Sequence, residues 1–243
     1  MKKRTGRLLI LICLLICIFC AALIQGRAFN RVCVSGCAVR GVDVSEYQGQ
    51  IDWAVLHDEE ISFAFIKATE GSSYTDPYFD VNWSNARENG ILTGAYHFFS
   101  FDSEAGTQAD NFISTVPYTE DSLPSVVDIE FYGSYKRTKP ANKDLVISEL
   151  GCLLDRLESA YGKRPIIYAT VSAYREYISG HFDDYPVWIR SVYVPASWWI
   201  GNNWTFWQYT DRAKLPGYSG PESCIDMNVF SGEYEDLVLL SNN

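Results

Sequence analysis

The pattern of hydrophobic and polar positions divides the chain into an apolar segment near the N-terminus and a longer region of alternating strands and helices. Lys2, Lys3, Arg4 and Arg7 precede a run over residues 8–24 that has no charge and almost no polar atoms. A basic stretch followed by such a run is typical of an export signal. The run is long for a signal peptide and close to the lower limit of the ~17–25 residues that span a bilayer.

The leader predicts where the protein acts. We expect residues 1–40 to form a signal peptide or signal-anchor with a short linker, and residues 41–243 to form one globular domain. The protein is then exported, to the extracellular space or the cell surface. If the segment is not cleaved, residues 8–24 anchor the protein in the membrane and are its only contact with lipid.

Residues 41–243 contain five pairs of a strand and a helix, followed by three strands that have no long helix between them. One helix, about Asn142–Tyr161, shows clear helical spacing of its apolar residues and is ended by Gly162. The predicted strands are Gly41–Ser45, Ser62–Ala68, Leu92–Phe99, Ser125–Phe131, Pro165–Thr170, Val187–Tyr193, Thr205–Thr210 and Ile225–Phe230. The other predicted helices are Asp52–Asp58, Tyr78–Asn89, Ser103–Val116 with Ser103 as its cap, and Ser172–Ile178.

This order of elements predicts an α/β barrel. Alternating strands and helices favour a parallel sheet covered by helices, and eight strands can close on themselves. The last third of such a barrel would lack its outer helices.

Two carboxylates end the fourth predicted strand. Asp128 and Glu130 are two residues apart, so their side chains point to the same face. Repulsion between neighbouring carboxylates favours a proton on one of them near neutral pH. Such a pair suits the cleavage of a glycosidic bond, although solvated acids at the end of a strand have the same pattern.

Other polar residues are expected at the same place, because the active sites of such barrels lie at the C-terminal ends of the strands. Asp43 lies near the end of the first strand, and Asp226 lies in the last strand, beside the first once the barrel closes. We therefore expect Asp43, Asp128, Glu130 and Asp226 to meet at one mouth. Tyr96 and Tyr168 lie near the ends of the third and fifth strands.

Composition and charge exclude several other functions. Seven of the 20 basic residues and none of the 30 acidic residues lie in residues 1–40, so the globular region is more acidic than the whole chain's −10. Such a surface repels nucleic acid. The three histidines have no metal-binding spacing, and no phosphate loop or dinucleotide motif is present. We predict no metal, no cofactor and a monomer.

An ordered set of motifs over residues 41–231 resembles the glycoside hydrolase family 25 muramidases, which have an irregular TIM-like (β/α)5(β)3 barrel. The opening GVDVSEYQGQIDW at 41–53 follows the family pattern, and Asp128-Ile129-Glu130 matches its DxE. The remaining matches are FIKATEG at 65–71, GAYHF at 94–98, PIIY at 165–168, PVWI at 186–189, WQYT at 207–210 and IDMN at 225–228. The chain departs from the family after Ile189, where Arg190-Ser191-Val192-Tyr193 replaces the usual Ala followed by Arg-Tyr.

The resemblance implies hydrolysis of the β-1,4 bond between N-acetylmuramic acid and N-acetylglucosamine, with peptidoglycan glycan strands as the partner. Glu130 would be the general acid and base. Asp128 would assist the 2-acetamido group of the substrate, or act as base toward a water with inversion. Asp43 and Asp226 would complete the acidic floor. Candidate sugar-binding residues are Tyr96, Tyr168, Trp188, Trp207, Gln208 and Tyr209, for which packing in the core is the competing interpretation.

Two alternatives to this function stay open from the sequence. One is a peptidoglycan-binding module with impaired catalysis, and the other is a hydrolase of chitin-like polymers. Lys67 and Glu70 are expected to form an internal ion pair or to brace a loop, and His97 to be a hydrogen-bonded histidine of the core. The stretch 131–139 is expected to have no helix and to shape the groove.

Overall fold

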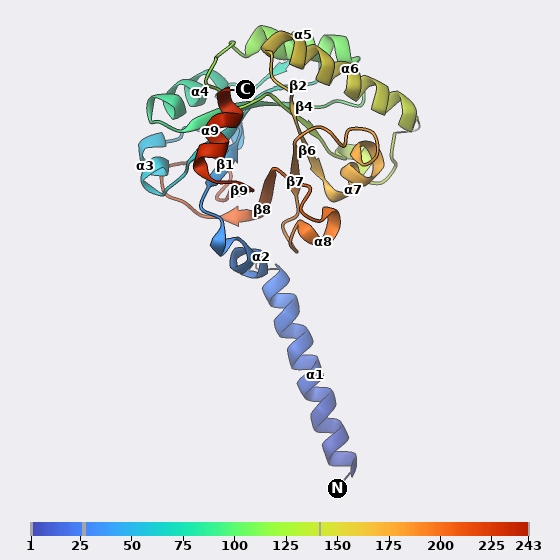
Figure 1. Ribbon diagram of the computed structural model, residues 1–243. Helices are drawn as coiled ribbons and strands as arrows, with labels where there is room; N and C mark the ends of the chain where they lie inside the picture. Colours follow the sequence, from blue (N-terminus) through green and yellow to red (C-terminus); the bar gives the residue numbers. More distant parts are fainter. Residues whose placement is uncertain (1, 26–27, 141, 243) are drawn as a thin grey trace.

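Eight strands close into a barrel in the computed structural model, which describes residues 2–25, 28–140 and 142–242 (Figure 1). The pairing of β1 with both β2 and β9 completes the ring. A short strand, β3 (Tyr74–Thr75), adds to the end of β2. The barrel strands are β1 (Arg40–Val44), β2 (Phe63–Glu70), β4 (Leu92–Phe98), β5 (Val126–Ile129), β6 (Ile166–Thr170), β7 (Val187–Arg190), β8 (Phe206–Ala213) and β9 (Ile225–Phe230). All eight predicted strands are therefore present, with ends that differ by a few residues.

The last strand runs in the opposite direction from the others. Neighbouring barrel strands from β1 to β8, which leaves out the short β3, are parallel, whereas β9 is antiparallel to both β8 and β1. The beginning of β9 therefore lies beside the end of β1. This direction brings Asp226, the second residue of β9, to the end of the barrel at which the other strands finish.

Helices cover the outside of the first five strands, as predicted (Figure 1). The helix α6 is capped by the Asn142 side chain, which accepts from the Leu145 amide, and it ends at Gly162 in the left-handed conformation. The covering helices are α3 (Trp53–Asp58), α4 (Phe79–Glu88), α5 (Ala105–Thr115), α6 (Lys143–Tyr161), and α7 (Val171–Ala173), which continues as a π-helical turn, η4 (Tyr174–Ile178).

The predicted cap of the third helix was wrong. The helix α5 begins at Ala105, and Ser103 makes no cap hydrogen bond to it. The Ala105 amide instead donates to Oε2 of Glu149 on α6, at 2.5 Å. A tertiary contact therefore satisfies the amide that the sequence assigns to a local serine.

Two helices in the last third were not predicted. A single turn, α8 (Ser197–Ile200), lies between β7 and β8, and α9 (Tyr234–Asn242) follows β9. The buried side chain of Leu237 on α9 packs with the inward-facing residues of the barrel, so α9 closes the N-terminal end of the strands. Lys163 connects α9 to the loop before β5, because its Nζ donates to the carbonyls of Glu120, Ser122 and Ser241.

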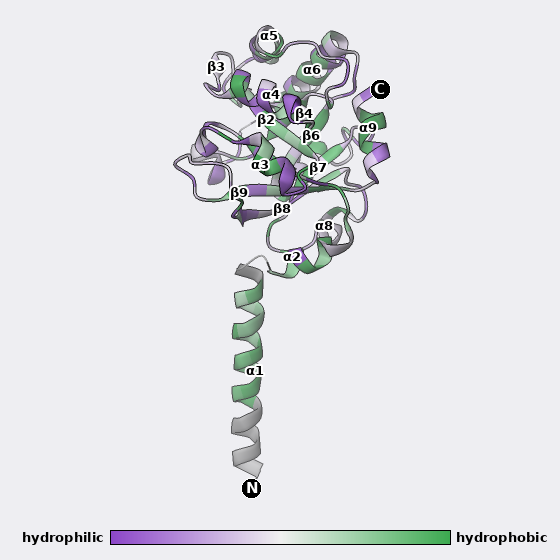
Figure 2. Cartoon of the chain, turned by 90° about the vertical axis from the view of Figure 1, so that its left-hand side faces the viewer, coloured by the Kyte–Doolittle hydropathy of each residue, from purple (hydrophilic) through white to green (hydrophobic). Residues whose placement is uncertain are grey.

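The N-terminal helices are α1 (Lys2–Gln25) and α2 (Ala28–Cys33), followed by a 3-10 turn, η1 (Val34–Gly36). Within the described parts of the chain, no single helix has both the length and the apolarity needed to cross a membrane. The pair Ile10–Leu23 and Ala28–Gly36 meets those requirements together, with a bend of 71° between its members. The described part of α1 is apolar over most of its length (Figure 2).

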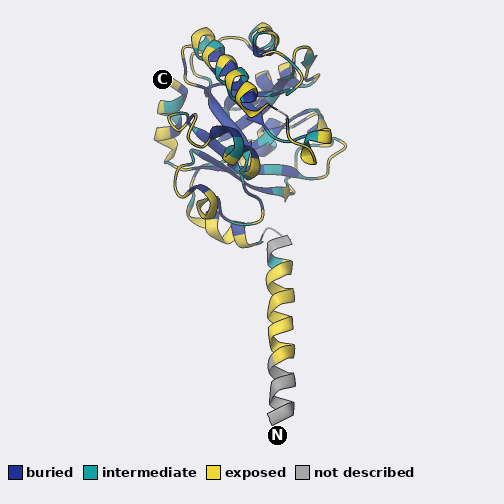
Figure 3. Ribbon diagram, turned by 90° about the vertical axis from the view of Figure 1, so that its right-hand side faces the viewer, coloured by how far each residue is buried: buried dark blue, intermediate teal, exposed yellow. Residues whose placement is uncertain are grey.

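Alternate residues of the strands form two apolar layers, and the strands are buried from both sides (Figure 3). The inner layer is aromatic at its centre, where Phe63, Phe65 and Phe206 make edge contacts 5.0 to 5.6 Å apart. The rings of Phe63 and Phe65 lie over Gly41 and Gly94, respectively. A β-carbon at Gly41 would be 2.5 Å from the Phe63 ring, and one at Gly94 would be 2.7 Å from the Phe65 ring.

Candidate active site

Asp43 and Asp226 meet at the C-terminal end of the barrel, where they are directly paired across β1 and β9. The amide nitrogen of Gln208 joins them. Its Nε2 donates to both oxygens of Asp43 at 2.9 Å and to Oδ2 of Asp226 at 3.0 Å. Asn228 donates a further hydrogen bond to Oδ1 of Asp43 at 2.7 Å. One carboxylate thus receives three amide hydrogen bonds.

The two carboxyl groups differ in their affinity for a proton. Burial raises the pKa of Asp226 to about 9, with help from the charge of Asp43 and against the attraction of Arg190. Burial also raises the pKa of Asp43, but the hydrogen bonds from Asn228 and Gln208 oppose this effect. Asp226 therefore holds the proton near neutral pH, and Asp43 is the ionised partner.

Asp128 lies in β5, which ends at Ile129, and Glu130 is the first residue after the strand. Val127 and Ile129 pack in the outer layer. Burial and the charge of Glu130 raise the pKa of Asp128 well above its usual value, and its Oδ1 is buried without a hydrogen-bond partner in the structure. Burial also raises the pKa of Glu130, against the attraction of Arg190 and Lys136.

Lys67 and Arg190 also act on the carboxylates. Lys67 forms the predicted ion pair with Glu70, at 2.7 Å between Nζ and Oε2, and its Nζ lies 5.2 Å from the centre of the Phe98 ring. Arg190, at the end of β7, pairs with Asp211 at 2.9 Å and acts electrostatically on Glu130 and Asp226. Arg190 is the residue at which the sequence departs from the family pattern, and its charge lies inside the site.

The tyrosines and Trp188 form the inner wall and the base of the site. The Tyr168 hydroxyl donates to Oε1 of Gln208 at 3.1 Å, so it orients the amide that joins the carboxylates. Burial and the nearby Asp43 and Asp128 raise the pKa of Tyr96 well above its usual value. Trp188 is buried, stacks on Phe65, and donates from Nε1 to Oδ1 of Asn228 at 2.8 Å.

The structure does not bring Trp207 and Tyr209 to the carboxylates. Both alternate with Gln208 on β8, and both pack in the outer layer. The Trp207 indole donates to the Ser191 carbonyl at 3.0 Å, and the Tyr209 carbonyl accepts from Asn30. The predicted sugar contact is replaced by packing, because the period of the strand gives Gln208 the inward position.

Sequence reasoning missed Asn228 and Arg190 as members of the site. Asn228 lies two residues after Asp226, so the period of a strand places both on one face. The same period places Arg190 with Trp188. Asp226 and Trp188 were already expected in the site, so the period of the strand was the signal that could have found Asn228 and Arg190.

A cleft of about 640 Å³ opens between the loops that follow β4 and β5. Asp102 and Tyr135 line it, and the Tyr135 hydroxyl donates to Oδ1 of Asp102 at 2.5 Å. Part of the stretch 131–139 borders this cleft, and the stretch contains a short 3-10 turn, η3 (Gly133–Lys136), where no helix was expected.

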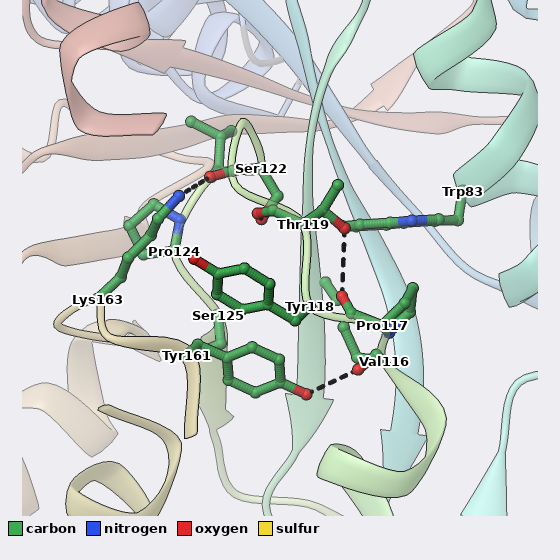
Figure 4. Close-up of a pocket in the computed structure, with 12 residues that line it drawn as sticks. Trp83, Val116, Pro117, Tyr118, Thr119, Ser122, Pro124, Ser125, Tyr161 and Lys163 are labelled. Atoms are coloured by element: carbon green, nitrogen blue, oxygen red, sulfur yellow. Dashed lines mark hydrogen bonds between the residues drawn. The ribbon is translucent and has the colours of Figure 1, made fainter. Parts of the chain in front are cut away.

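A second pocket lies before the start of β5, away from the carboxylates (Figure 4). Tyr161 and Lys163 border it, and the Tyr161 hydroxyl donates to the Val116 carbonyl at 2.9 Å. Its volume is about 10 Å³, which suits one water at most. This pocket is too small for a sugar.

His97 is a residue of the core, as predicted. Its ring is fully buried, with Nδ1 at 2.7 Å from Oγ1 of Thr69 and Nε2 at 3.1 Å from Oε1 of Gln108. Burial lowers the pKa of His97 to about 4, so the ring is neutral at physiological pH.

Comparison with known proteins agrees with this geometry. The sequence profile described as "Glycosyl hydrolases family 25" matches residues 42–218. A solved structure of a family 25 glycosyl hydrolase from Bacillus anthracis is 47% identical, covers 84% of this chain and 94% of its own, and superposes with a TM-score of 0.79.

Two curated relatives are also similar over most of the chain. Uncharacterized protein YegX of Escherichia coli (strain K12) is 41% identical over 82% of this chain and 72% of its own length. Lysozyme M1 of Streptomyces globisporus is 34% identical over 84% of this chain and 72% of its own length. The match of the profile, the identities and the barrel with its acidic mouth lead to one conclusion: this chain belongs to glycosyl hydrolase family 25.

Proposed function

We propose that this chain is a muramidase in which Glu130 is the general acid and base and Asp128 assists the substrate. It hydrolyses the β-1,4 bond between N-acetylmuramic acid and N-acetylglucosamine in peptidoglycan. The observation that carries the assignment is that buried Asp128 and half-buried Glu130 lie within electrostatic reach of Asp43, which is paired with Asp226.

Asp128 and Glu130 act as a coupled pair that shares one proton near neutral pH. The unpartnered Oδ1 of Asp128 is suited to accept the N–H of the substrate's 2-acetamido group. That hydrogen bond favours the ionised form of Asp128. The shared proton then stays on Glu130, which can donate it to the leaving glycosidic oxygen.

The reaction has two steps. Glu130 donates its proton to the glycosidic oxygen while the acetamido oxygen attacks the anomeric carbon, so the glycosidic bond breaks as a cyclic intermediate forms. Glu130 then removes a proton from a water that opens the ring, and the configuration at the anomeric carbon is retained. This route belongs to the substrate-assisted exceptions among glycosidases. Asp128 stabilises the positive charge that develops on the acetamido group.

The remaining groups of the site support these two residues. Asp43, Gln208 and Tyr168 form a fixed hydrogen-bonded floor. Tyr96 borders the space above it. The cleft between the loops after β4 and β5 is lined by residues that follow the strand ends, and its Tyr135 is a candidate contact for further units of the glycan strand.

The enzyme acts outside the cell. Residues 1–40 form the export segment and linker, residues 41–243 form the catalytic barrel, and the chain works outside the cell as a monomer. Residues 8–24 anchor it to the membrane when they are retained. The basic residues before this run and its apolar character support this part of the proposal.

The test is the Glu130→Gln variant, compared with the wild type and with Glu88→Gln, which changes an exposed carboxylate on α4. General acid catalysis contributes ~10²–10⁴-fold, so release of reducing ends from purified walls should fall by that factor in Glu130→Gln alone. Thermal unfolding should show that both variants fold. Near-normal hydrolysis by folded Glu130→Gln would refute the role of Glu130, and wall binding without hydrolysis by the wild type would refute the enzyme.

A further inference from the structure

An exposed apolar surface lies where α2 meets α8, on the flank of the barrel that has no long covering helix (Figure 1). Four side chains define this flank patch. Their exposed fractions are 36% for Phe29, 72% for Val32, 63% for Trp198 and 42% for Trp199. The rings of Phe29 and Trp198 are 5.5 Å apart between centroids, so the patch is continuous between the two helices.

The patch is held rigidly on the barrel. Asn30, between Phe29 and Val32, is fully buried, and its Nδ2 donates to the carbonyls of Ser191 at 2.7 Å and Tyr209 at 2.9 Å. These bonds fix α2 against β8 and the end of β7. Folding therefore holds the side chains of Phe29 and Val32 in water at a defined position. Such exposure is unfavourable unless another surface covers the patch.

The hydrophobic segment leads directly into this patch. The apolar side chains of α1 are exposed, from Ile10 to Phe19 (Figure 3). The two views in Figures 1 and 2 agree that α1 extends from the side of the barrel on which α2 and α8 lie. An apolar environment that surrounds α1 would therefore also lie next to the flank patch.

The chemistry of the patch is that of a membrane interface. Tryptophan is enriched where lipid headgroups meet acyl chains, because its ring is apolar and its N–H is polar. Arg175 lies with its guanidinium 4.7 Å from the centre of the Trp199 ring, and Arg31 is exposed on α2. Both cations are placed to reach lipid phosphates.

We propose that the flank patch lies in the headgroup region of the membrane that residues 8–24 enter, so that the barrel rests on the bilayer on its flank. This inference depends on the proposed anchor function of that segment. The site then opens neither toward the bilayer nor directly away from it. It opens sideways, because the patch covers the outside of β8 and the carboxylates lie at the end of the strands. A glycan strand that runs along the membrane surface could then enter the site lengthwise.

The tryptophans of the chain provide a direct test. Trp53, Trp83, Trp188 and Trp207 are buried and Trp204 is half-buried, which leaves Trp198 and Trp199 as the exposed tryptophans of the seven. The full chain is reconstituted into phosphatidylcholine vesicles in which the acyl chains carry bromine near the headgroup. Bromine quenches tryptophan emission on contact, and vesicles without bromine give the reference.

Bromolipid should quench the wild type and the control Trp83→Phe to the same extent. Most of that quenching should be lost in Trp198→Phe/Trp199→Phe, which keeps the surface apolar while removing the fluorophores. Equal quenching in the double variant would overturn the inference. Wild-type emission that bromolipid leaves unchanged would also overturn the inference. Cross-linking of two copies through the patch, with emission unchanged, would show that a second copy covers it instead. Flotation separates the two proposals: a chain that floats with vesicles unquenched refutes the flank patch alone, whereas a chain that does not float refutes the anchor as well.

Discussion

Asp43 and Asp226 are direct partners across the antiparallel pair β1 and β9, and they bind the same amide nitrogen of Gln208. Two carboxyl groups this close cannot both be ionised without a large electrostatic cost. The proton that the pair keeps is on Asp226, since Asp43 receives the greater number of amide hydrogen bonds. A half-buried, neutral acid thus helps to hold the ionised floor of the site.

The stability of the fold should depend on pH through Asp226. The pKa of this group is about 9 in the folded chain against a usual value of 3.8, so the folded state keeps a proton that the unfolded state releases between these limits. Stability therefore falls as pH rises through this interval. Asp226→Asn keeps a neutral donor beside Asp43 and removes the titration. Its unfolding free energy should exceed that of the wild type by more than about 1.4 kcal/mol at pH 8, the equivalent of one pKa unit.

Chemical denaturation at several pH values measures this difference. The advantage of Asp226→Asn should shrink toward zero near pH 4, whereas Asp80→Asn, which changes an exposed carboxylate on α4, should show no such trend. A difference between Asp226→Asn and the wild type that is the same at every pH would contradict the assignment of the proton.

Arg190 should set the alkaline limb of the pH profile. Its charge opposes the rise in the pKa of Glu130 that burial produces. Removing the charge in Arg190→Ala should let Glu130 keep its proton to higher pH, so the alkaline limb of kcat/KM should move up by about one unit. Arg190→Lys keeps the charge and should leave the limb close to its original place. A limb that moves equally in both variants would show that Arg190 acts through its shape or its hydrogen bonds.

Asp128 should govern both rate and stereochemistry. Asp128→Asn removes the charge that stabilises the acetamido group in the transition state, and loss of one such electrostatic contact costs about 10²–10³ in kcat. NMR of the first product anomer formed by the wild type tests the route itself. Retention agrees with attack by the acetamido group, and inversion would instead make Asp128 the base for a water.

The contact between Gly94 and Phe65 should make the interior intolerant of a single methyl group. Gly94→Ala places a β-carbon 2.7 Å from the Phe65 ring, and overpacking of this kind costs about 1–3 kcal/mol. Gly151→Ala is the matched control, because its β-carbon would be 3.6 Å from Phe182, which is ordinary contact, on the helix α6. That variant should gain about 0.5–1 kcal/mol from helix propensity. Denaturant unfolding of both variants checks the opposite signs.

The sequence alone determined the eight barrel strands, the helices that cover the first five of them, and the acidic pair. Apolar spacing and capping residues gave the long helix from Asn142 to Gly162, and the period of a strand placed Asp128 and Glu130 on one face. These features depend on neighbours within a few residues, so local physics decides them. The family motifs added the type of barrel, an irregular TIM-like (β/α)5(β)3 barrel.

The tertiary structure decided which faces and which distant groups meet. The antiparallel direction of β9 brings Asp226 to Asp43, and closure of the barrel turns Gln208 inward while Trp207 and Tyr209 turn outward. The cap of α5 by Glu149 and the burial of Asn30 against β8 likewise come from segments far apart in the chain. A repeating pattern fixes how residues alternate along a strand, but only the closed barrel fixes which alternate set lies inside, because that choice depends on what every other strand must bury.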